Sequence, residues 1–192
     1  MAQTARQVLE HTASILKSKE VIEVQFEGTH FNGLEEAGTA TGTLILKGSK
    51  FRIESDELTC WFDGHTQRTL LKGRDEVNVN TPTKAEMQKM NPYTFVDLYK
   101  KDYDLKVAEV TYQDKTCHEV RLVAKKKDQD IQLLIAVIDP KTYVPLSIRV
   151  KDLRGEWVRI RVPQLRTVGK KSDDFFRFDT RQHPDIEVID LR

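Results

Sequence analysis

Short segments in which apolar and polar residues alternate, separated by turn residues, occupy residues 41–82 of the chain. The alternation predicts strands at Thr41–Lys47, Phe51–Ser55, Leu58–Phe62, Thr66–Leu71 and Glu76–Asn80. Asp63-Gly64 is typical of a two-residue type I′ turn, because both residues tolerate a positive φ. Short turns make successive strands antiparallel. This part of the chain therefore predicts an antiparallel sheet.

The same pattern occurs before and after this segment. We expect further strands at Val21–Phe26, Leu105–Tyr112, Cys117–Ala124, Ile131–Ile138, Val144–Val150, Trp157–Val162 and Phe175–Phe178, and a connection at Gly28–Gly38. Ile131–Ile138 is apolar on both faces, which favours a place in the middle of the assembly. About eleven strands are too many for a flat open sheet. We therefore predict one domain over residues 1–192, mainly β, with a strongly curved antiparallel sheet that forms an incomplete β-barrel.

Three helices are predicted on the concave side of this sheet. Ala5–Lys17 carries apolar residues with a helical period. Thr83 and Glu86 have the spacing of a capping box at the start of a helix that runs to about Met90. Asn91-Pro92 is typical of a new helix start. The last two helices together present Met87, Met90, Phe95, Leu98 and Tyr99, a surface rich in flexible and aromatic side chains.

Composition and motifs exclude several functions. Lys and Arg total 31 against 30 Asp and Glu, so the net charge of +1 argues against nucleic acid as a partner. No apolar run reaches the roughly 18 residues of a membrane span. The five histidines lack zinc-site spacing, and neither Gly-x-Ser-x-Gly nor a nucleotide-binding glycine loop is present. We expect no cofactor, no metal and no enzymatic activity.

Two further features concern cysteine and arginine. Cys60 and Cys117 both fall inside predicted strands, which is typical of buried free thiols, and a disulfide between them is the alternative. Arg159 and Arg161 alternate with apolar residues, so we expect a strand with a cationic wet face. That face is a candidate for docking a partner.

Three stretches resemble the LolA-like periplasmic lipoprotein carriers. Gly42-Thr43-Leu44-Ile45-Leu46-Lys47 followed by Lys50-Phe51-Arg52-Ile53-Glu54 is similar to a strand pair of that family, and Trp61-Phe62-Asp63-Gly64-His65-Thr66-Gln67 is similar to its next hairpin. The tail from Phe176-Arg177-Phe178 to Pro184-Asp185-Ile186-Glu187-Val188-Ile189-Asp190 is similar to its ending. The order of helices and strands agrees with this resemblance, which covers nearly the whole domain.

The resemblance implies a monomeric periplasmic protein whose signal peptide is not part of this sequence. It implies an incomplete β-barrel whose interior binds the acyl chains of lipoproteins or a related lipid. Its partners would be an inner-membrane lipoprotein release complex and an outer-membrane acceptor. Well-known members hold their helical lid with an arginine before a proline, where this chain has Gly48 and Ser49, so we expect other lid contacts here.

Candidate lining residues for such an interior come from both layers. They are Phe26, Leu44, Leu46, Phe51, Ile53 and Trp61 from the sheet, with Met87, Met90, Phe95, Leu98 and Tyr99 from the helices. Each of them is also an ordinary core residue. The alternative is a non-enzymatic sensor or interaction module on the same scaffold, as in the related anti-sigma-factor regulators, with a filled interior and an outer docking face at Arg159 and Arg161.

Overall fold

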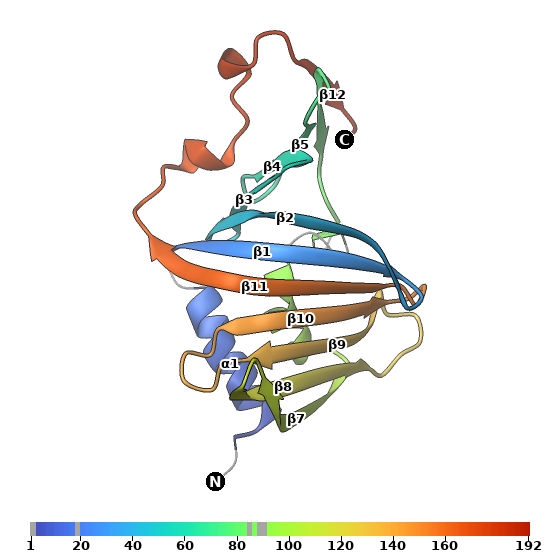
Figure 1. Cartoon of the computed structure of the whole chain (residues 1–192). Helices are drawn as coiled ribbons and strands as arrows, with labels where there is room; N and C mark the ends of the chain where they lie inside the picture. The colour runs from blue at the N-terminus through green and yellow to red at the C-terminus, as the bar shows by residue number, and fades with distance from the viewer. Residues whose placement is uncertain (1–2, 18–19, 84–85, 88–91) are drawn as a thin grey trace.

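The computed structural model describes residues 3–17, 20–83, 86–87 and 92–192 (Figure 1). In chain order its elements are α1 (Ala5–Leu16), β1 (Val21–Asn32), β2 (Glu35–Lys47), β3 (Lys50–Ser55), β4 (Leu58–Phe62), β5 (Gln67–Leu71), β6 (Glu76–Asn80), the 3₁₀ helix η1 (Pro92–Lys100), β7 (Tyr103–Tyr112), β8 (Lys115–Ala124), β9 (Ile131–Ile138), β10 (Pro145–Asp152), β11 (Trp157–Val168), the 3₁₀ helices η2 (Asp173–Phe176) and η3 (Thr180–Gln182), and β12 (Glu187–Asp190).

All twelve of these strands belong to one sheet, in the order β12-β6-β5-β4-β3-β2-β1-β11-β10-β9-β8-β7. The first and last strands of this order are not paired with each other, so the sheet is curved but open, as predicted. Neighbours are antiparallel except β12 and β6, which are parallel. The two halves of the sheet meet at β1 and β11, where Val21 faces Val168.

Helices α1 and η1 lie on the concave side of the sheet. In Figure 1, α1 lies behind the sheet, and it contacts β7, β8 and η1. Its start is fixed by a capping box, since Thr4 Oγ1 accepts from Gln7 N at 3.2 Å and Gln7 Oε1 accepts from Thr4 N at 2.9 Å. The predicted capping box at Thr83 and Glu86 also forms: Thr83 N donates to Glu86 Oε2 at 2.7 Å, and Glu86 N donates to Thr83 Oγ1 at 3.3 Å. Most of the predicted helix that follows lies outside the described residues, and the third helix is 3₁₀ over Pro92–Lys100.

The main core fills the space between the helices and the sheet. Its buried residues come from α1, η1, β1–β4 and β7–β11, which makes it continuous across both halves of the sheet. Val8, Phe51 and Phe95 are at most 1% exposed. The core depends on the period of two in each strand, which turns every second side chain toward the helices.

A smaller cluster lies on the opposite face of β4–β6, beneath the C-terminal tail. Trp61 and Phe178 meet edge to face, with ring centroids 5.3 Å apart, and Val77 completes the buried set. The tail then adds β12 beside β6. The predicted strand at Phe175–Phe178 is wrong, because Phe175 and Phe176 belong to the 3₁₀ helix η2, in which Phe176 is fully buried.

Three local expectations also need correction. Gly28–Gly38 is not a connection outside the sheet: β1 and β2 extend through it and turn at Gly33, whose φ is +65°. Asp63-Gly64 is not a two-residue turn, because four residues separate β4 from β5 and the Asp63 carboxylate accepts the backbone N–H groups of His65 and Thr66. Ile131–Ile138 is largely buried, but β9 is third from the β7 edge and not central.

Candidate functional site

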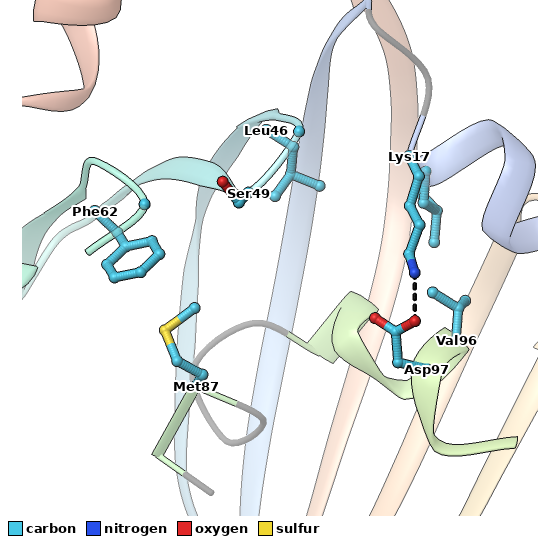
Figure 2. A pocket seen from close by; sticks show the side chains of 10 residues that line it. Lys17, Leu46, Ser49, Phe62, Met87, Val96 and Asp97 are labelled. Atoms are coloured by element: carbon cyan, nitrogen blue, oxygen red, sulfur yellow. Dashed lines mark hydrogen bonds and ion pairs between the residues drawn. The ribbon is translucent and has the colours of Figure 1, made fainter. Parts of the chain in front are cut away.

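A cavity of about 550 Å³ opens at one end of the space between the sheet and the helices (Figure 2). It lies between the C-terminal end of α1, the middle of η1, and the turns that connect β2 with β3 and β4 with β5. Its lining residues are Leu16, Lys17, Leu46, Gly48, Ser49, Phe62, Gly64, Met87, Val96 and Asp97. Its volume falls within the roughly 300–1,000 Å³ of small-molecule sites.

The lining is mostly apolar, and its two charged residues pair with each other. Lys17 at the end of α1 forms an ion pair with Asp97 on η1 (Figure 2). This pair connects the two helical elements across the cavity. Leu46 and Phe62 belong to the main core cluster, and Met87 packs against it. The cavity is therefore continuous with the apolar interior, and among the described residues its charged lining consists of the paired Lys17 and Asp97.

The sheet side of the opening is held by the C-terminal tail. Lys47 Nζ and Lys50 Nζ, on either side of the Gly48-Ser49 turn, lie 2.9 and 2.7 Å from the Asp173 carboxylate. Lys47 Nζ also donates to the backbone oxygen of Lys171 at 2.9 Å. Hydrogen bonds from Lys50 and Lys47, together with their positive charges, lower the pKa of Asp173 to about 2. We call Lys47, Lys50 and Asp173 the latch, and its Asp173 carboxylate is ionised at neutral pH.

The second turn at the opening has its own support. Burial raises the pKa of the Asp63 carboxyl, but the hydrogen bonds from the backbone of Thr66 and His65 and the charge of Arg68 outweigh it, so the pKa lies below its usual value. The ionised Asp63 thereby fixes the loop that places Gly64, with φ +101°, on the cavity wall. The opening is framed by two ordered turns.

The sequence-predicted lining residues divide into four groups. Leu46 and Met87 line the cavity. Leu44, Phe51, Phe95, Leu98 and Tyr99 are buried in the main core, and Phe26 and Ile53 pack against it. Met90 lies outside the described residues. Trp61 belongs to the smaller cluster beneath the C-terminal tail.

Placing Trp61 on the concave side is wrong. Its neighbours Cys60 and Phe62 belong to the main core, so the alternation along β4 turns Trp61 to the opposite face. There it packs with Phe178, and the Arg52 guanidinium lies 5.4 Å from its ring centroid. Tertiary packing of the tail covers this tryptophan and accounts for its burial.

Several lining residues were missed from the sequence. Phe62 is two residues from Cys60 on the same strand face, and Leu16 lies on the apolar stripe of α1, so periodicity alone could have indicated both. Val96 is buried beside Phe95 in a 3₁₀ helix, in which an α-helical period is misleading. Gly48 and Ser49 also lie on the cavity wall.

The described residues contain no group of three or more His, Cys, Asp and Glu side chains arranged to hold a metal ion. None of the helices in the described ranges is both long and apolar enough to cross a membrane. Cys60 and Cys117 are both buried, and both are free thiols.

The fold is that of a β-protein with an open, curved sheet, whose concave side holds helices and an apolar cavity. The sequence profile of the family described as outer membrane lipoprotein carrier protein LolA matches residues 1–154. The chain therefore belongs to this family. The match ends before β11, the strand that joins the two halves of the sheet. No curated protein matches the sequence.

Solved structures support the same fold. An uncharacterized conserved protein from Thermus thermophilus is 10% identical, with a TM-score of 0.65 and coverage of 98% of this chain and 99% of the other. MucB is 13% identical, with a TM-score of 0.52 and coverage of 91% and 62%. A DUF1329 family protein from Desulfovibrio piger is 13% identical, with a TM-score of 0.51 and coverage of 92% and 98%.

Proposed function

We propose that this protein is a non-enzymatic periplasmic carrier that holds the acyl chains of lipoproteins, or of a related lipid, and moves them toward the outer membrane. The observation that carries the proposal is the apolar cavity of about 550 Å³ between α1, η1 and the β2–β3 and β4–β5 turns. The family to which the chain belongs supports the choice of cargo. By the same resemblance, the chain receives cargo from an inner-membrane release complex and gives it to an outer-membrane acceptor.

The physical properties of the cavity suit an acyl chain. Burial stabilises each methylene by roughly 0.8 kcal/mol, so the affinity of a long chain needs no specific polar contact. Met87, which has three rotatable bonds, can adapt to a chain of irregular shape. The Lys17–Asp97 ion pair is half exposed, and such pairs contribute only about 0–1 kcal/mol. Breaking this ion pair therefore costs little, which favours loading and release.

The test is native mass spectrometry of the protein exported to the periplasm, before and after addition of a synthetic triacylated lipopeptide. We expect an acyl-bearing species with one ligand per protein. Met87→Glu should abolish it by placing a charge in the cavity, and Ser49→Trp should abolish it by filling the opening from an exposed turn. Leu153→Glu is the control, since Leu153 is 51% exposed and does not line the cavity.

A protein that stays free of ligand and takes up no lipopeptide would overturn the proposal. That result would favour the interaction module, which needs no hollow interior. Equal uptake by the Met87→Glu, Ser49→Trp and control variants would show that the lipopeptide binds at another site.

A further inference from the structure

A second candidate site lies on the convex face of the sheet, opposite α1. Ile148 belongs to the main core, so its neighbours Ser147 and Arg149 on β10 point to the other face. The register of β10 and β11 places Arg149 opposite Arg159 and Ser147 opposite Arg161. The basic stripe seen in the sequence is therefore wider than one strand.

Two hollows meet at this arginine pair. One, of about 280 Å³, has Phe31, Leu34 and Trp157 among its lining residues. The other, of about 560 Å³, extends from β11 toward the β7–β8 hairpin and is lined in part by Tyr112 and Val137. Arg149 and Arg159 line both hollows. We call this continuous surface the convex groove: aromatic at one end and cationic along its middle.

Arg149 and Arg159 carry like charges on directly opposed positions of neighbouring strands. Like charges directly opposite each other on neighbouring strands repel. Each arginine has one carboxylate partner within the sheet: Arg149 with Glu119 at 3.5 Å, Arg159 with Glu36 at 2.9 Å, and Arg161 with Glu27 at 3.3 Å.

Glu119 is the one carboxylate among the lining residues of the two hollows. It is already held by Arg121, whose Nη2 lies 2.6 Å from its Oε1. Within the part of the chain that the structure describes, the hydrogen bonds of the Arg159 guanidinium all come from Nη2. Two arginines, Arg121 and Arg149, therefore share the single negative charge of Glu119, and the Arg159 guanidinium has further donors for an anionic ligand.

The spacing of the groups indicates the kind of ligand. Trp157, Arg159 and Arg161 are alternate residues of one strand, so each step is about 7 Å. A single phosphate is too small to reach both arginines and the aromatic end. An extended peptide has the same repeat between alternate side chains. Tryptophan, tyrosine and arginine are also the residues that protein interfaces favour.

We propose that the convex groove binds an extended segment of a partner protein, with an apolar side chain against Phe31 and Trp157 and acidic side chains at alternate positions on Arg159 and Arg161. The Arg159 guanidinium lies over the Phe31 ring at 5.1 Å, which holds it in place between the two parts of the segment. This inference does not depend on the proposed cargo, because the groove and the cavity lie on opposite faces of the sheet.

The test is fluorescence anisotropy at low ionic strength with a fluorescein-labelled peptide, Gly-Ser-Leu-Ser-Glu-Ser-Glu-Ser-Gly, and the same peptide in reverse order. We expect saturable binding by one of them, lost when both Glu are replaced by Gln. Arg159→Gln should weaken it by about tenfold. Arg161→Gln should also weaken binding. Because Arg161 is more exposed than Arg159, its substitution is less disruptive to the fold, and a loss in both variants points to the groove and not to a folding defect.

Arg166→Gln is the matched control. It lies on the same strand and pairs with Glu23, but it lines neither hollow. We expect it to change the affinity by no more than about twofold. No binding of either peptide, or equal losses in Arg166→Gln and Arg159→Gln, would overturn the proposal. So would binding to phosphatidylglycerol vesicles alone, because that result would assign the groove to a lipid surface.

Discussion

At the scale of single residues, Gly42 is the glycine at which an added Cβ atom would meet its neighbours most closely. Phe26 and Gly42 face each other in the β1–β2 register. A Cβ atom at position 42 would lie 2.8 Å from Phe26 Cζ and 2.4 Å from the backbone oxygen of Glu54. The phenylalanine ring therefore covers the glycine, and the partial burial of Phe26 depends on the missing side chain.

We predict that Gly42→Ala lowers the free energy of unfolding by about 1–3 kcal/mol, since the added methyl group must displace a strand backbone. Gly38→Ala on the same strand is the control, because its Cβ would meet no atom within 4 Å. That variant should stay within about 1 kcal/mol of the wild type. Urea unfolding measures both. Similar values for the two variants would contradict the role assigned to Gly42.

The buried thiol of Cys60 makes the stability of the fold depend on pH. Burial raises its pKa from 9.0 to about 11, and hydrogen bonds from Thr69 and Gln67 offset only part of this. The unfolded chain therefore loses the Cys60 proton at lower pH than the folded chain. The contribution of the Cys60 thiol to the free energy of unfolding is fully retained below about pH 9. It is lost as the pH rises toward 11, by about 3 kcal/mol in total.

Urea unfolding under reducing conditions at pH 8 and pH 11 checks this prediction. Other groups also titrate in this range, so the measured quantity is the difference between the wild type and Cys60→Ala. The wild type should lose more stability than the variant over this interval. Equal losses would show that the thiolate is tolerated in the fold.

At the scale of elements, regular strands followed their sequence pattern, while turns and the tail depended on specific contacts. Leu58–Phe62, Glu76–Asn80 and Ile131–Ile138 have the predicted bounds. Asp-Gly predicted a type I′ turn, but the Asp63 carboxylate captures backbone N–H groups and stabilises a longer loop. Phe176 and Phe178 have the spacing of a strand, but Phe176 is buried in the 3₁₀ helix η2 and Phe178 packs in the smaller cluster with Trp61.

The tail is attached at η2, where Asp173 binds Lys47 and Lys50. We predict that Asp173→Asn speeds amide hydrogen exchange in residues 170–178, because the neutral side chain no longer holds both ammonium groups. Mass spectrometry of exchanged peptides measures this. Asp174→Asn is the control, since its side chain is 89% exposed and pairs with Arg177 at 3.7 Å.

The latch should also respond to acid with a defined sign. The pKa of Asp173 is lowered from 3.8 to about 2, so its stabilising effect is complete above about pH 4 and is lost as the pH falls through 2. Exchange in residues 170–178 should therefore not depend on the ionisation of Asp173 between pH 5 and 8. Equal protection in Asp173→Asn and the wild type would contradict the latch.

At the scale of the whole molecule, a curved open sheet with helices on its concave side was predictable, because strand number and helix amphipathicity are local properties. The order of the strands was not. Pairing of β1 with β11 and of β6 with β12 joins distant segments, and no local pattern specifies such partners. The same distinction applies to the candidate site. Which residues face the concave side follows from local alternation, but the burial of Trp61 on the other face depends on contacts with the distant C-terminal tail.

The pairing of β1 with β11 also determines when the sheet can form. Val21 pairs with Val168, so residues 21–168 must all have left the ribosome before the two halves of the sheet can join. Until then β2 covers one edge of β1, and the other edge exposes a row of unpaired N–H and C=O groups. Contacts of such long sequence separation slow folding. During biosynthesis the chain therefore passes through an interval in which this strand edge is open to pairing with other chains.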